Sequence, residues 1–232
     1  MNITWTKLFL CCVFFWCSML FADVDKIYHP YVEQNTYELE SRAITKIDND
    51  LLTNFSLYRL GFGKDVTEKL FLEFYLIGAK TGEQNLQVNS YELEALYQFT
   101  EQGEYWADIA FLIELQRDRL SKEWEGNFAL IAEKEFGRWS ATVNIHNLYQ
   151  FIEDQRHEWK FEQSFQFRYR YRKSFEPGIE IYSDNQSLFV GPVIMGQVKF
   201  GHQRLSWEIG LDQKLSRSED DTVLRALLEF EF

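Results

Sequence analysis

Charged residues recur at every second position in several stretches of the sequence, and this spacing is the most specific chemical signal of the chain. Arg168, Arg170 and Arg172 stand two residues apart, and so do Glu133 and Glu135. Side chains two apart in a strand project from the same face, so each run places its charges together. Rings of charges inside a pore sort solutes by sign. The other interpretation is that these charges pair with one another and stiffen the protein.

His146 is the only candidate for catalysis. Acyl transfer requires a nucleophile, a base within hydrogen-bond reach and an orienting group. Ser140 and Thr142 share the face of His146, but Ser140 is out of reach because residues two apart in a strand are roughly 6 to 7 Å apart. A nucleophile would come from a neighbouring strand, where Ser164 lies nearest by level. We favour a histidine that is only hydrogen-bonded to polar neighbours.

The sequence predicts no metal centre and no cofactor. The other histidines lie at expected strand ends or turns and lack the spacing of metal ligands: His29, His157 and His202. The acidic run at 219–221 could hold a divalent cation loosely, although solvated loop charge is the simpler interpretation. All three cysteines lie within the first 22 residues, which leaves no thiol chemistry for the remainder of the chain.

Residues 1–22 have the pattern of a secretory signal peptide. Lys7 precedes an apolar run that ends at Ala22, and the charged Asp23 follows. The chain has 36 acidic and 24 basic residues, and loss of Lys7 makes it more acidic than its formal net charge of −12. An acidic exported chain is a poor partner for nucleic acid. Residues 23–232 contain no apolar run of about 20 residues, which excludes a helical membrane protein.

Alternation of apolar and polar residues predicts strands throughout residues 23–232, which we expect to form a single domain. In the range 159–172, for example, Phe165 and Phe167 alternate with Gln166 and Arg168. The pattern predicts twelve antiparallel strands, at 32–43, 54–63, 69–79, 86–99, 105–117, 124–136, 138–151, 157–172, 175–183, 187–200, 204–215 and 222–232. Pro177 and Pro192 each remove a ladder hydrogen bond, so we expect bulges or a miscounted strand there, with ten strands as the alternative.

The position of the apolar residues favours a closed transmembrane β-barrel over a soluble sandwich. The strands are long enough to cross a bilayer at a tilt, and their apolar faces lack charge apart from Lys134, near a strand end. If the first strand runs outward from the periplasm, aromatic residues gather at the periplasmic rim, as in an interfacial girdle. They are Phe62, Phe99, Tyr105, Phe136, Trp139, Tyr171, Phe175, Phe200 and Phe232.

The last strand carries a resemblance to a known group of proteins. Apolar residues occupy alternate positions up to Phe230 and Phe232. With the leader, the even strand number and the absence of later cysteines, the chain resembles the small porin-like outer-membrane β-barrel proteins of Gram-negative bacteria. The resemblance implies a location in the cell outer membrane, contact with its lipids, and insertion by the barrel-assembly machinery, with Phe230 and Phe232 as the insertion signal.

The polar faces of such a barrel would line its lumen. We expect the lumen or selectivity residues to be Arg59, Glu73, Glu133, Glu135, Arg168, Arg170 and Arg172. The predicted loops are too short to fold inward as a large plug. The favoured function is a narrow channel for small polar or charged solutes. A lipid-modifying or hydrolytic barrel that uses His146, and a sealed structural barrel, are the alternatives.

Overall fold

The computed structural model describes residues 24–47, 55–82, 85–151, 157–215 and 221–232. The predicted signal peptide, residues 1–22, lies outside these residues. The described strands form a single barrel. No helix among the described residues is long and apolar enough to cross a membrane.

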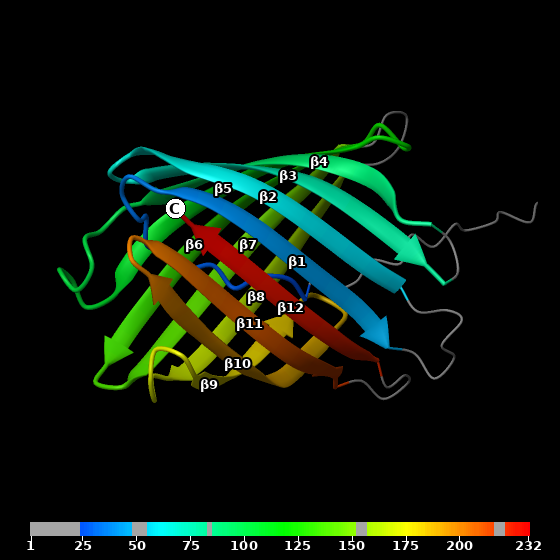
Figure 1. Ribbon diagram of the computed structural model, residues 1–232. Helices are drawn as coiled ribbons and strands as arrows, with labels where there is room; N and C mark the ends of the chain where they lie inside the picture. The colour runs from blue at the N-terminus through cyan, green and yellow to red at the C-terminus, as the bar shows by residue number, and fades with distance from the viewer. Residues whose placement is uncertain (1–23, 48–54, 83–84, 152–156, 216–220) are drawn as a thin grey trace, which may run out of the picture.

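Twelve antiparallel strands close into one barrel, in which β1 pairs with β12 and every other strand pairs with its neighbours in sequence (Figure 1). The strands are β1 (Tyr37–Ile47), β2 (Phe55–Thr67), β3 (Leu70–Thr81), β4 (Gln87–Gln98), β5 (Asp108–Asp118), β6 (Trp124–Phe136), β7 (Trp139–Phe151), β8 (Glu158–Tyr169), β9 (Glu176–Ser183), β10 (Leu188–Phe200), β11 (Gln203–Lys214) and β12 (Thr222–Glu231). The prediction of twelve strands is confirmed, and the alternative of ten is wrong.

The barrel has two distinct ends. Tyr37 and Phe232 meet at one, which we call the terminal end, through backbone hydrogen bonds of 2.9 and 3.0 Å. The β6–β7 turn at Gly137 and the β10–β11 turn at Gly201 lie at this end, and both glycines have a positive φ that favours a residue without a Cβ. The opposite end, where β1 finishes at Ile47 and β12 starts, is the loop end.

The first strand begins later than the alternation predicted. Residues 32–36 do not belong to β1, because the chain turns at Asn35, whose φ of 56° lies in the left-handed region. The Asp65 carboxylate accepts hydrogen bonds from the backbone N–H groups of Asn35 (2.9 Å) and Thr36 (3.0 Å). This turn takes the preceding residues out of the barrel wall.

The bulges expected at the two prolines are also wrong, since the β9–β10 register runs through Pro177 and Pro192 without a shift. Pro177 lies beyond Gly178, the last residue of β9 that pairs with β8, so its missing N–H falls outside that ladder. Pro192 is absent from the pairs that join β10 to β11. Register shifts among the described strands occur instead beside Asp65 in β2 and beside Gly78 in β3.

The barrel is polar inside and apolar outside. Buried inner residues include Glu40, Arg42 and Arg225, each at most 1% exposed, whereas Leu60 and Leu93 on the outer face are at least half exposed. All the aromatic residues of the predicted girdle are exposed. This inverted distribution suits a wall between lipid and a polar lumen, as in a transmembrane β-barrel.

Candidate functional site

Residues 24–36, which we call the lumen segment, run through the interior of the barrel (Figure 1). Near the loop end Val24 is buried in an apolar cluster with Phe189 and Val223. At the terminal end Glu33 accepts a hydrogen bond of 2.7 Å from Arg204. The sequence predicted only that no loop is long enough to form a large plug. The lumen segment, which occupies the interior, comes instead from the N-terminal side of β1.

A series of ion pairs joins the start of the lumen segment to the wall. The Asp25 carboxylate binds the guanidinium of Arg42 and, at 2.9 Å, that of Arg59. The Lys26 ammonium lies 2.7 Å from a carboxylate oxygen of Glu40 and 2.7 Å from one of Glu229. The adjacent segment residues Asp25 and Lys26 thus bind wall residues of opposite charge.

The same wall residues are linked to one another. Arg42 donates from Nε and Nη2 to one oxygen of Glu40, at 3.0 and 2.6 Å. Arg59 donates from Nη1 to Glu92 at 2.7 Å. Charge-assisted bonds of this kind fix the orientation of both partners, so this part of the wall is ordered by its own contacts as well as by the segment.

Tyr28 is held by hydrogen bonds at both its backbone and its side chain. Its N–H donates to Asn144 Oδ1 at 2.7 Å, and its carbonyl accepts from Asn144 Nδ2 at 2.9 Å. Its hydroxyl donates to Glu94 at 2.8 Å or to Glu114 at 2.9 Å. The Asn144 side chain therefore satisfies the backbone hydrogen-bonding groups of Tyr28, as the backbone of a neighbouring strand would.

An apolar strip of the inner wall packs against Tyr28. It consists of Leu96, Ala110, Leu112, Ala129 and Ile131. These side chains lie on the polar, inward parity of β4, β5 and β6, where a water-filled lumen does not require them. This strip was the signal in the sequence that another part of the chain enters the barrel, and a prediction based on the period of two alone overlooks it.

The predicted charge cluster at Glu133 is present in part. Glu133 is 1% exposed and lies 3.5 Å from Arg168 and 3.4 Å from Arg170. Glu135 binds Arg170 at 2.5 Å. His29 of the lumen segment adds a contact of 2.6 Å to Glu133. The structure therefore joins two predicted arginines, both predicted glutamates and the segment.

Arg172 does not belong to this cluster. The prediction extended the strand to residue 172, but β8 ends at Tyr169 and Arg172 is exposed, in an isolated bridge with Phe175. Its guanidinium lies 4.9 Å from the ring centre of Tyr171. The chain leaves the barrel wall before this residue, so the alternation no longer points its side chain inward.

The two remaining predicted lumen residues, Arg59 and Glu73, are both buried. Arg59 belongs to the ion-pair series. Glu73 Oε1 has no hydrogen-bond partner among the described residues, and a Cβ added at Gly61 would collide with it and with the ring of Tyr75. Gly61 therefore provides the space that these two inner side chains occupy.

No nucleophile among the described residues is hydrogen-bonded to His146. Its Nδ1 lies 2.8 Å from Nδ2 of Asn127, and it faces a small cavity of about 50 Å³. Ser140 and Thr142 donate to Glu133, at 2.7 and 3.1 Å. Ser164 Oγ has no hydrogen-bond partner within the described part of the chain. The interpretation of His146 as a histidine with polar neighbours fits this geometry.

A larger cavity of about 370 Å³ opens on the terminal-end side of the segment, and Lys26 and Tyr28 line both cavities. Its wall carries charges of both signs. The acidic residues include Glu38, Glu73, Glu94 and Glu229, and the basic residues include Arg168, Arg170 and Lys173. The lumen segment thus divides the polar interior into two compartments.

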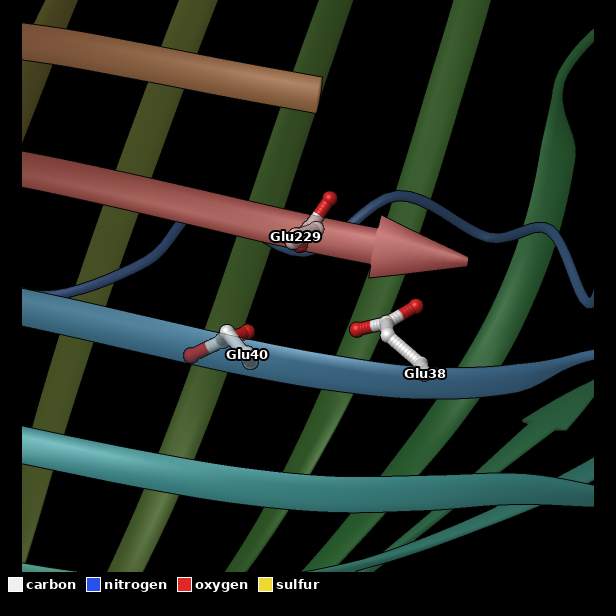
Figure 2. Close-up of side chains that lie close together, drawn as sticks. All are labelled: Glu38, Glu40 and Glu229. Carbon is white, nitrogen blue, oxygen red and sulfur yellow. The ribbon is translucent and has the colours of Figure 1, made fainter. Parts of the chain in front are cut away.

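Two groups of three carboxylates are close enough to hold a cation. Oxygens of Glu38, Glu40 and Glu229 lie within 4.8 Å of one another, from the adjacent strands β1 and β12 (Figure 2). The Lys26 ammonium already binds two of them. The second group, Glu92, Glu94 and Glu114, receives the Tyr28 hydroxyl. The chain itself supplies the partner of each group.

The fold is a closed twelve-stranded β-barrel with a polar lumen, an architecture that it shares with porins. Neither the protein-family models nor the curated proteins contain a match to the sequence.

The solved structures with the same fold include the following three. The NanC porin has 9% identity and a TM-score of 0.60, with 83% of this chain and 98% of that chain covered. The KdgM porin in complex with disordered oligogalacturonate has 13% identity and a TM-score of 0.57, with 84% and 99% covered. An outer-membrane channel from Pseudomonas putida F1 has 12% identity and a TM-score of 0.55, with 90% and 97% covered.

Proposed function

We propose that the protein is a narrow channel of the outer membrane for small polar or charged solutes, closed by the lumen segment in the conformation described above. The polar and charged inner wall supports this proposal, since a barrel that only had to be stable could fill its interior with apolar side chains. The fold shared with porins supports it as well. In the membrane, the terminal end would face the periplasm, where barrels of this type have their short turns.

One observation carries the proposal. The lumen segment crosses the interior without taking part in the strand pairing of the described barrel. Its backbone is held by side chains instead, as at Tyr28 by Asn144 and at Val32 by Gln98 (2.8 Å). Water can replace such contacts when the segment moves, whereas removal of a paired strand would open the barrel itself.

Recordings from planar bilayers test the channel. We expect the full mature protein to conduct in brief, small steps, and a variant without residues 24–33 to conduct in longer and larger steps. A heat-modifiability gel establishes that each preparation contains folded barrel. Silence of both folded proteins at all voltages contradicts the proposal.

The alternative of a sealed structural barrel is favoured by a different observation, the density of ion pairs around the segment. Arg42 alone binds Asp25 and Glu40, and Glu40 also binds Lys26. If the segment never leaves, the full protein is silent and only the shortened variant conducts. The same recordings therefore separate the two functions.

A further inference from the structure

The wall residues that hold Asp25 and Lys26 form two adjacent recognition sites of opposite sign. Arg42 and Arg59 face a carboxylate, and Glu40 and Glu229 face an ammonium group. We propose that these four residues are a binding site for a small zwitterionic solute of the dipeptide class, which the side chains of Asp25 and Lys26 occupy while the channel is closed. This inference rests on the proposed channel function and names its solute class.

Three of the four site residues are buried in the closed conformation, and wall residues orient both arginines. Glu40, Arg42 and Arg59 are between 0% and 7% exposed. Arg42 is oriented by Glu40, and Arg59 by Glu92. Binding residues that their own neighbours orient keep their geometry when the ligand changes. Departure of the segment therefore leaves Glu40, Arg42 and Arg59 oriented beside Glu229.

Charge balance selects a ligand with both signs. When Asp25 and Lys26 leave, two guanidinium groups lose a carboxylate and two carboxylates lose an ammonium group. An anion restores only the contacts of the two arginines, and a cation restores only those of Glu40 and Glu229. A zwitterion restores both, with no change in the total charge of the lumen.

The relative position of the two sites indicates how far apart the ligand's charges are. One oxygen of Glu40 binds Lys26 and the other binds Arg42, whose guanidinium continues to Asp25. No ion pair joins Asp25 to Lys26 in the described part of the chain. The carboxylate and ammonium of a single α-amino acid are too close together to span this arrangement, whereas those of an extended dipeptide are separated by a peptide unit.

Solute can approach this site from both compartments of the lumen. The cavity of about 370 Å³ reaches Lys26 and Glu229, and the cavity of about 50 Å³ reaches Asp25 and Arg59. The site therefore lies between the two cavities, where we expect it to contribute to the selectivity of the channel.

Blockade of the ion current tests the site in an opened variant, Asp25→Ala with Lys26→Ala. We expect glycylglycine to block this variant at concentrations at least tenfold lower than acetate, ethylammonium or glycine. Adding Glu229→Gln should weaken blockade by glycylglycine and ethylammonium and leave blockade by acetate unchanged. Adding Arg59→Gln should weaken blockade by glycylglycine and acetate and leave blockade by ethylammonium unchanged. Glu101→Gln, in the exposed Lys69 pair outside the strands, is the matched control and should change none of them.

The unmodified protein provides a second readout that does not depend on the variants. Glycylglycine should compete with Asp25 and Lys26 and raise the open probability, whereas acetate or ethylammonium alone should not. Conductance with equal blockade by all four solutes, and no effect on the unmodified protein, overturns the zwitterion site and leaves the channel intact. Silence of every folded variant overturns the channel itself.

Discussion

At the scale of single residues, several buried charges of the lumen have specific partners, and Glu133 is the clearest case. Glu133 accepts hydrogen bonds from Ser140 and Thr142 and faces His29 and Arg168. A carboxylate buried to this degree is stable only because these groups replace the water that it loses. Its removal should therefore have a larger effect than the removal of a carboxylate at the rim.

Glu133→Gln should lower the free energy of unfolding by roughly 1 to 3 kcal/mol, because Ser140 and Thr142 lose a charged hydrogen-bond acceptor in a buried place. Glu135→Gln is the control, since its half-buried pair with Arg170 should contribute about 1 kcal/mol or less. Urea titration of the two barrels in lipid vesicles measures the difference. Equal midpoints would show that Glu133 has no special structural role.

His146→Ala should leave the lipid composition of the outer membrane unchanged. Its imidazole contacts Asn127, and the geometry provides no hydrogen bond from a nucleophile to this ring among the described residues. Mass spectrometry of the membrane lipids, with and without the protein and its variant, checks this expectation. A lipid change that depends on the protein and disappears in His146→Ala would establish the hydrolytic or lipid-modifying alternative.

At the scale of elements, the turn before β1 determines where the lumen segment goes. The left-handed φ of Asn35 and the two hydrogen bonds to Asp65 direct the chain from the wall into the lumen. Lys64, next to Asp65 in β2, lies 4.7 Å from the ring centre of Tyr37, at the start of β1. The turn at Asn35, which we call the hinge of the lumen segment, is thus attached to β2.

Asp65→Ala should loosen this hinge and raise the frequency of channel opening several-fold, because two backbone N–H groups lose their acceptor. Asn35→Gly is the matched control, since glycine keeps the left-handed φ and the N–H donor. Single-channel recordings of both variants measure the effect. An unchanged frequency in Asp65→Ala would mean that the contacts deeper in the lumen alone hold the segment.

The last strand raises a separate question about assembly. Phe232 stacks on Tyr37 and Phe230, with ring centres 5.9 and 5.6 Å apart, where β12 closes the barrel against β1. We propose that Phe230 and Phe232 are also the signal for the barrel-assembly machinery, as the resemblance to outer-membrane barrels implied.

Deletion of Phe232 should reduce the amount of heat-modifiable barrel in the outer membrane by several-fold. Phe200→Ala is the control, because Phe200 is also an exposed aromatic residue at the terminal end of another strand. Refolding of the purified chains in detergent should be similar for both. If both variants accumulate equally in the membrane, Phe232 contributes only to the aromatic girdle.

At the scale of the whole molecule, the acidic composition describes the interior more than the surface. The formal net charge is −12, and many of the acidic residues lie on the inner wall, paired with arginines and lysines. The outer wall is apolar, and Lys134, the charge noted on that face, lies 5.5 Å from the ring centre of Trp106. The charge is thus placed where lipid does not reach it.

The barrel wall is encoded locally and could be predicted from the sequence. Strand number, the strand range 124–136, the exposed girdle and the inward face of Glu133 and Arg168 all follow from a period of two, which each strand expresses on its own. Errors occurred where that period continues beyond the wall, at residues 32–36 and at Arg172. In both places the alternation persists although the chain has left the sheet.

The contents of the barrel, in contrast, depend on tertiary contacts. The partners of the lumen segment are distant in sequence: Tyr28 meets Asn144, and the carbonyl of Asp25 accepts from the hydroxyl of Tyr182. No local pattern encodes contacts across more than a hundred residues, because they exist only once the strands close and set the width of the lumen. Closure brings the wall charges round Asp25 and Lys26, and with them the site that we propose for a zwitterionic solute.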